Sequence, residues 1–246
     1  MVLVHGWGVG PAVMSGLAEE LSASWPVNLL ALPGYGGNHH LSIGPNIDCY
    51  AEILAASIEP ESILVGWSLG GMVALALAKC CEHIKALVLL ASTPCFTNKP
   101  DWSYGVDAGR IDNMIEGLHD KPETVLNEFL LLASLGDASP RETRRALAKH
   151  IDTEQINKTA LHSGLSILRD TDLRSCLRQI TCPVILVLAE HDRLVSGSVG
   201  AAAQHILSGL RLEIISGTGH APFISQPRQT ASVITHALTA VLDEPV

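Results

Sequence analysis

The chain has 246 residues, of which 47% are hydrophobic, and a formal net charge of −9. A chain of this size can bury one sizeable core and still carry an inserted subdomain. The acidic balance argues against a nucleic-acid partner, because binding a phosphate backbone requires a basic surface.

The sequence also disfavours a membrane protein and a zinc-binding protein. The N-terminus lacks a basic segment followed by a long apolar one, and no run reaches the about 18 apolar residues of a membrane span. The six cysteines are scattered, without zinc-finger spacing. We therefore expect a cytoplasmic protein with reduced thiols and no metal or organic cofactor. Cys95 is a candidate nucleophile, but a buried thiol is the favoured interpretation.

Short apolar runs bounded by turn residues are typical of buried parallel strands. In chain order they cover residues 2–4, 27–31, 63–65, 86–90, 184–188 and 212–215. Helical stretches, such as residues 72–79 and 198–207, lie between them. This alternation predicts an α/β protein with a mostly parallel central sheet and helices on both faces.

The strand pattern is interrupted once. From about residue 96 to 174 amphipathic helical patterns replace it, for example at 123–135 and 141–151. We predict a helical lid at 96–174, inserted into a core formed by residues 1–95 and 175–246.

A G-W-S-L-G-G motif at residues 66–71 joins the third predicted strand to a helix. Ser68 at its centre resembles the nucleophile of the α/β-hydrolase fold, where a tight strand-to-helix turn exposes the serine. Such a turn strains the serine backbone and leaves no room for bulky residues at Gly66 and Gly70. The helix N-terminus that follows favours a developing oxyanion.

A serine hydroxyl needs a base to remove its proton and a carboxylate to orient that base. In this fold the acid and then the histidine follow in loops after later strands. Asp192 follows the fifth predicted strand and His220 follows the last. Of the ten other histidines, His39 and His40 lie in a polar loop, and His83 and His205 lie in helical stretches. Glu190 is the rival acid.

The oxyanion also needs backbone N–H donors. We assign one to Leu69, directly after the nucleophile, and the other to Trp7, in an H-G-W-G turn after the first strand. We expect both residues, with Ser68 and His220, to contact the substrate. The alternative for Trp7 is a core aromatic, and for His5 a structural role is favoured.

Several motifs together resemble the pimeloyl-acyl-carrier-protein methyl ester carboxylesterases of biotin biosynthesis. They are H-G-W-G, L-P-G-Y-G at 32–36, the serine motif, A-S-T-P-C-F at 91–96 with Trp102 after it, and H-A-P-F-I-S at 220–225. The last two are the more specific to the family. The resemblance implies hydrolysis of the distal methyl ester of a pimeloyl chain carried on acyl carrier protein, by a monomeric enzyme.

The resemblance also implies an acyl channel in the lid. The apolar segment in the matching position contributes Phe129, Leu130, Leu131, Leu132 and Ala133. These side chains would favour a neutral methyl ester over a charged end. The alternative is that they pack the lid onto the core, and we expect that of about half of them.

A basic stripe in the lid suits an acidic carrier protein. Its members recur on one predicted helical face: Arg141, Arg144, Arg145 and Lys149. A solvated helix face is the alternative. The chain departs from the resemblance at Thr124 and Glu128, where family members can carry further arginines. It also departs at its start, where relatives have one or two strands before the H-G-W-G turn.

Other functions remain open. The same residues would serve a general short-chain carboxylesterase or a carbon–carbon bond hydrolase acting on a small diketone. A non-catalytic ligand-binding protein of this fold is a more distant alternative.

Overall fold

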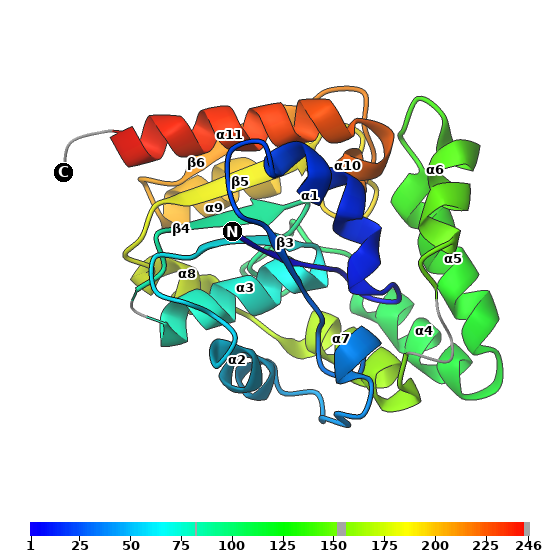
Figure 1. Cartoon of the computed structure of the whole chain (residues 1–246). Coiled ribbons are helices and arrows are strands. Elements are labelled where there is room, and N and C mark those ends of the chain that lie inside the picture. Colours follow the sequence, from blue (N-terminus) through cyan, green and yellow to red (C-terminus); the bar gives the residue numbers. More distant parts are fainter. Residues whose placement is uncertain (82, 152–155, 244–246) are drawn as a thin grey trace.

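The computed structural model describes residues 1–81, 83–151 and 156–243. Its centre is a six-stranded sheet in the order β2-β1-β3-β4-β5-β6, and every neighbouring pair is parallel (Figure 1). The strands are β1 (Val2–Val4), β2 (Asn28–Leu30), β3 (Ile63–Trp67), β4 (Ala86–Leu90), β5 (Val184–Ala189) and β6 (Arg211–Ile215). The six predicted strands are confirmed.

Burial along the strands follows their place in the sheet. Every residue of β3, β4 and β5 is buried, whereas β2 at the edge is largely exposed. A central parallel strand is covered on both faces, and so it reads as an uninterrupted apolar run. This is the pattern that made these strands visible in the sequence.

Helices cover both faces of the sheet (Figure 1). On one face α1 (Ser15–Leu21) packs against the C-terminal α11 (Pro227–Asp243). The other face carries α2 (Ile47–Ala55), α3 (Leu69–Cys80), α8 (Arg174–Gln179) and α9 (Val199–Ile206). Short helical turns complete the core at η1 (Pro11–Met14), η2 (Gly36–Asn38) and α10 (Pro222–Ser225).

Four helices lie together at one end of the sheet, and we call them the inserted helices (Figure 1). They are α4 (Ala108–Asp120), α5 (Pro122–Ser134), α6 (Pro140–Ala148) and α7 (Lys158–Asp170). The described part of the predicted lid contains isolated bridges but no regular strand, as expected, and residues 152–155 lie outside the described residues. One bridge joins Cys95 to Asp172, so the two ends of the insertion meet.

Helix boundaries were predicted less well than strands. The predicted helix at 141–151 ends at Ala148, where the chain turns so that the carbonyl of His150 accepts a hydrogen bond from the Gly10 amide at 3.0 Å. This contact is not visible from sequence periodicity. No helix among the described residues is long and apolar enough to cross a lipid bilayer.

Candidate active site

Ser68 lies at the junction between β3 and α3. Its backbone has φ 56° and ψ −121°, in a region that residues with side chains rarely adopt. The Ser68 amide donates to the Leu90 carbonyl at 3.0 Å, and Ser92 Oγ donates to the Ser68 carbonyl at 2.7 Å. A Cβ at Gly70 would collide with the carbonyl oxygen of His5. The strained turn is therefore held from several sides.

Three side chains form a continuous hydrogen-bonded chain. His220 Nε2 lies 2.8 Å from Ser68 Oγ, and His220 Nδ1 lies 2.8 Å from Asp192 Oδ2. The side chains of His220 and Asp192 are fully buried. With the proton on Nδ1 donated to the carboxylate, Nε2 is free to accept the serine proton. The geometry is that of a serine nucleophile with its base and orienting acid.

The second oxygen of Asp192 is fixed by the backbone. Oδ1 accepts hydrogen bonds from the Leu194 amide at 2.7 Å and the Val195 amide at 3.0 Å. Glu190, the rival acid, is about half exposed, and its Oε2 accepts from the Gly217 amide at 2.8 Å. Asp192 is therefore the acid that contacts the histidine, whereas Glu190 contacts the backbone of the loop that precedes His220.

Of the two backbone amides assigned to the oxyanion, that of Leu69 directly follows the serine, and that of Trp7 follows Gly6, where a Cβ would approach the Ser68 Cβ to 3.2 Å. Leu69 begins α3, so its N–H is among those without an intrahelical acceptor. Among the described residues, neither the Leu69 nor the Trp7 amide donates a hydrogen bond. The Trp7 indole is fully buried, and its Nε1 donates to the Leu161 carbonyl at 2.8 Å. The side chain of Trp7 is thus a core aromatic, while its amide remains free.

His5 serves the structure of the turn. Its Nε2 accepts a hydrogen bond from the Leu32 amide at 3.0 Å, so Nδ1 carries the proton and donates to the Gly6 carbonyl at 2.8 Å. Complete burial lowers the pKa of His5 to about 4. The structural role favoured for this residue agrees with these contacts.

An apolar cavity opens beside Ser68. It is lined also by Phe96, Val106, Arg110, Ile111, Met114, Phe129, Leu132, Leu165, Leu168 and Leu194. Besides Ser68, these residues come from the inserted helices α4, α5 and α7, from the segment that precedes α4 and from the loop after β5. An ester group placed at Ser68 would therefore sit in surroundings that disfavour a charge.

Only two residues of the predicted channel segment line this cavity, Phe129 and Leu132. The prediction is wrong for Leu131, which is 43% exposed, and Leu130 and Ala133 are buried elsewhere. The reason is helical period: in α5, positions three apart share a face, whereas their neighbours turn away. The burial of Leu130 and Ala133 matches the alternative that about half of the segment serves packing.

The lining residues on α4 and α7 were not predicted from the sequence. The pairs Ile111 with Met114 and Leu165 with Leu168 show the i, i+3 spacing of one helix face. Arg110 has no apolar spacing that would have indicated it, and it is the one ionisable side chain among the described lining residues.

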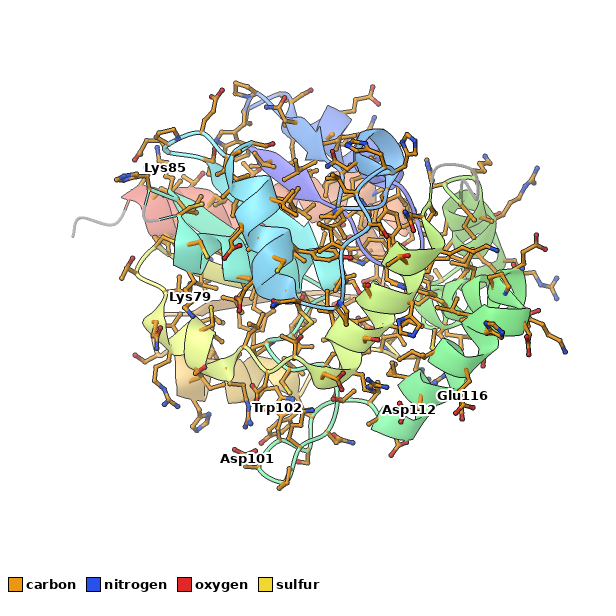
Figure 2. All side chains as sticks on the ribbon, turned by 90° about the horizontal axis from the view of Figure 1, so that it is seen from below. Lys79, Lys85, Asp101, Trp102, Asp112 and Glu116 are labelled. Atoms are coloured by element: carbon orange, nitrogen blue, oxygen red, sulfur yellow. The ribbon has the colours of Figure 1, made fainter. Side chains whose placement is uncertain are left out.

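The basic stripe lies on α6 and at its C-terminal cap, away from the cavity. Arg141, Arg145 and Lys149 are exposed, and Arg144 is half-buried. By contrast, the outer side of α4 carries the acidic Asp112 and Glu116 (Figure 2). The inserted helices therefore present a basic and an acidic surface on different elements.

Cys95 does not have the environment of a nucleophile. It is fully buried, and its Sγ donates to the Thr97 carbonyl at 3.4 Å. Burial raises the pKa of its thiol to about 11, which disfavours the reactive thiolate. The expectation of a buried thiol is confirmed.

The chain belongs to the alpha/beta hydrolase family, whose model matches residues 1–233. An esterase structure from Exiguobacterium antarcticum superposes with a TM-score of 0.84 at 19% identity, over 97% of this chain and 92% of that one, and shows the shared fold. The pimeloyl-acyl-carrier-protein methyl ester esterase of Aromatoleum aromaticum is 36% identical over 95% of this chain and 96% of the relative. The esterase of the same name from Xylella fastidiosa strain 9a5c is 33% identical, over 98% and 95%. The resemblance inferred from the motifs is confirmed, and the protein is a carboxylic ester hydrolase.

Proposed function

We propose that this protein hydrolyses the methyl ester of pimeloyl-acyl carrier protein methyl ester, releasing methanol and pimeloyl-acyl carrier protein for biotin biosynthesis. The observation that carries the proposal is the chain of 2.8 Å hydrogen bonds from Ser68 to His220 to Asp192 beside an apolar cavity. The names of the relatives that match nearly the whole chain support the substrate.

In the first half of the reaction Ser68 Oγ attacks the ester carbonyl carbon while its proton passes to His220 Nε2. The carbonyl oxygen becomes an oxyanion, which the amides of Leu69 and Trp7 stabilise. Asp192 holds the imidazole and stabilises its positive charge. The carbon–oxygen bond to methanol then breaks, and methanol leaves with the proton from His220. The product of this half is an acyl-serine.

In the second half water attacks the acyl-serine. His220 takes a proton from the water, a second oxyanion forms in the same place, and the bond to Ser68 Oγ breaks as His220 returns the proton to it. The free carboxylate of the pimeloyl chain is released. Each of these steps uses groups of this chain.

The cavity supports a methyl ester as the reacting end. An uncharged ester enters apolar surroundings at little cost, whereas the carboxylate that is formed is disfavoured there. Product charge therefore assists release. We assign residues 96–174 as the lid that carries most of this lining, and residues 1–95 and 175–246 as the catalytic core.

The basic stripe on α6 supports docking of an acidic carrier protein, because opposite charges steer association and orient partners. We propose docking over α6, by a monomer. The six cysteines are free thiols, which supports a reducing compartment such as the cytoplasm.

The test is methanol release from methyl pimeloyl-acyl carrier protein, compared with release from free short-chain methyl esters. We expect kcat/KM to be higher for the carrier-linked ester. Equal or lower values for that substrate would support the general short-chain esterase instead. A fluorophosphonate probe separates both from a non-catalytic protein: the wild type should be labelled, and Ser68→Ala should not.

A further inference from the structure

Asp137 lies in the connection between α5 and α6, and its carboxylate is buried against the loop that carries His220. Its Oδ1 accepts hydrogen bonds from the Gly219 amide at 2.9 Å and from Ser225 Oγ at 2.8 Å. Asp137 is 6% exposed, and its Oδ2 is buried without a donor among the described residues. Burying a carboxylate oxygen without a hydrogen-bond donor costs folding free energy. Such a group in a folded protein calls for an explanation.

The residues before Asp137 are wedged between two loops of the core. Gly136 has φ 96°, and a Cβ there would collide with the carbonyl oxygen of His191, next to Asp192. The Leu135 carbonyl lies so close to Gly219 that a Cβ on Gly219 would approach it to 2.5 Å. One short connection between inserted helices thus touches both the acid loop and the histidine loop.

The histidine loop is otherwise held by the core. Trp67 Nε1 donates to the His220 carbonyl at 2.7 Å, and the His191 amide donates to the Thr218 carbonyl at 3.0 Å. Asp137, which belongs to the inserted-helix side, accepts hydrogen bonds from one residue before His220 in the chain and one residue after it. The backbone on both sides of His220 is therefore in contact with the inserted helices as well as with the core.

We propose that Asp137 is a positioning residue that couples the inserted helices to His220. By holding Gly219 and Ser225 it keeps Nε2 at hydrogen-bond distance from Ser68 Oγ when the α5–α6 connection is in place. The inference rests on the proposed roles of Ser68 and His220. A displacement of about 1 Å at such a base costs on the order of 100-fold in rate.

The experiment measures the rate at which a fluorophosphonate phosphonylates Ser68, together with kcat and KM for a free methyl ester and the urea denaturation midpoint. We expect Asp137→Ala to slow phosphonylation and lower kcat by about 10- to 100-fold, with KM within about twofold. Asp137→Asn keeps an oxygen that accepts both hydrogen bonds but buries an unpaired NH₂ group. It should lose stability and keep kcat within about threefold.

Asp112→Ala is the matched control, because it removes an inserted-helix carboxylate that bonds Arg169 at 2.7 Å and does not touch the histidine loop. Its phosphonylation rate should equal that of the wild type. The proposal is overturned if Asp137→Ala keeps the wild-type rate per active site, or if Asp137→Asn loses as much rate as Asp137→Ala. Phosphonylation needs no carrier-linked substrate, so failure on that substrate alone would reject the proposed function and leave this inference standing.

Discussion

The indole Nε1 of Trp67 donates a hydrogen bond to the backbone carbonyl of His220 at 2.7 Å. The residue before the nucleophile thus fixes the backbone of the base, 153 positions away in the chain. The Trp67 ring also packs edge-on against Phe223, with centroids 5.0 Å apart. One buried side chain thus links the residue before the nucleophile to the backbone of the base.

Replacing Trp67 with phenylalanine should reduce both activity and stability. The change keeps an aromatic ring but leaves the buried His220 carbonyl without its donor, which costs about 1–3 kcal/mol of unfolding free energy. We expect kcat to fall by about tenfold as the base shifts. Trp102→Phe is the control, since Trp102 Nε1 donates to the Cys95 carbonyl at 2.9 Å, outside the cavity lining. It should destabilise the protein less in urea, because the Cys95 carbonyl keeps the Thr93 hydroxyl as a donor at 3.0 Å, and it should leave kcat unchanged. An equal loss of kcat in both variants would refute the coupling.

Asp192→Asn and Glu190→Gln should separate the two acids. The amide at position 192 favours the wrong tautomer of His220, so kcat should drop by on the order of 10⁴-fold. Glu190→Gln keeps an oxygen that accepts from the Gly217 amide, and we expect kcat within about threefold of wild type. Steady-state kinetics on one methyl ester measures both. A larger loss in the Glu190 variant would reverse the assignment.

Leu132→Asn should weaken substrate binding, because it places a polar amide in the apolar cavity. We expect KM to rise by about tenfold for a methyl ester of a long acyl chain, corresponding to about 1.4 kcal/mol. Leu131→Asn makes the same chemical change on the exposed face of the same helix. It should leave KM unchanged, and a rise in both variants would argue that α5 is simply destabilised.

Charge reversal on α6 should affect the carrier-linked substrate selectively. We expect Arg141→Glu with Arg145→Glu to raise KM for methyl pimeloyl-acyl carrier protein by about tenfold at low salt, and by less at high salt, where charges are screened. KM for a free methyl ester should not change. The matched control reverses Arg178 and Arg228, on α8 and α11, and should leave both KM values unchanged.

His5 should make the protein less stable in acid. Its pKa is lowered from 6.5 to about 4 by burial, so the unfolded chain takes up a proton at this residue before the folded protein does. Stability is then complete above pH 6.5 and is lost as the pH falls from about 6.5 to 4, by about 3 kcal/mol in total. Urea denaturation at several pH values measures this loss. The slope in that window should be shallower in His5→Gln, and an identical slope would contradict the assignment to His5.

The sequence by itself determined the strands, the order of elements and the residues of the hydrogen-bonded chain. Buried parallel strands are continuous apolar runs, and the strand-to-helix turn at Ser68 has a local signature of glycines and a serine. Asp192 and His220 were found because the fold puts them in loops after particular strands. These features depend on short stretches of chain and on chain order.

Only the tertiary structure decided which side chains meet. That Asp192 contacts His220 while Glu190 contacts the Gly217 amide depends on the direction of two side chains in one loop, and the face of α5 that lines the cavity depends on how that helix packs. The contact of Asp137 with Gly219 and Ser225 joins segments more than 80 positions apart. Such contacts follow from packing of the whole chain, which no local pattern of residues records.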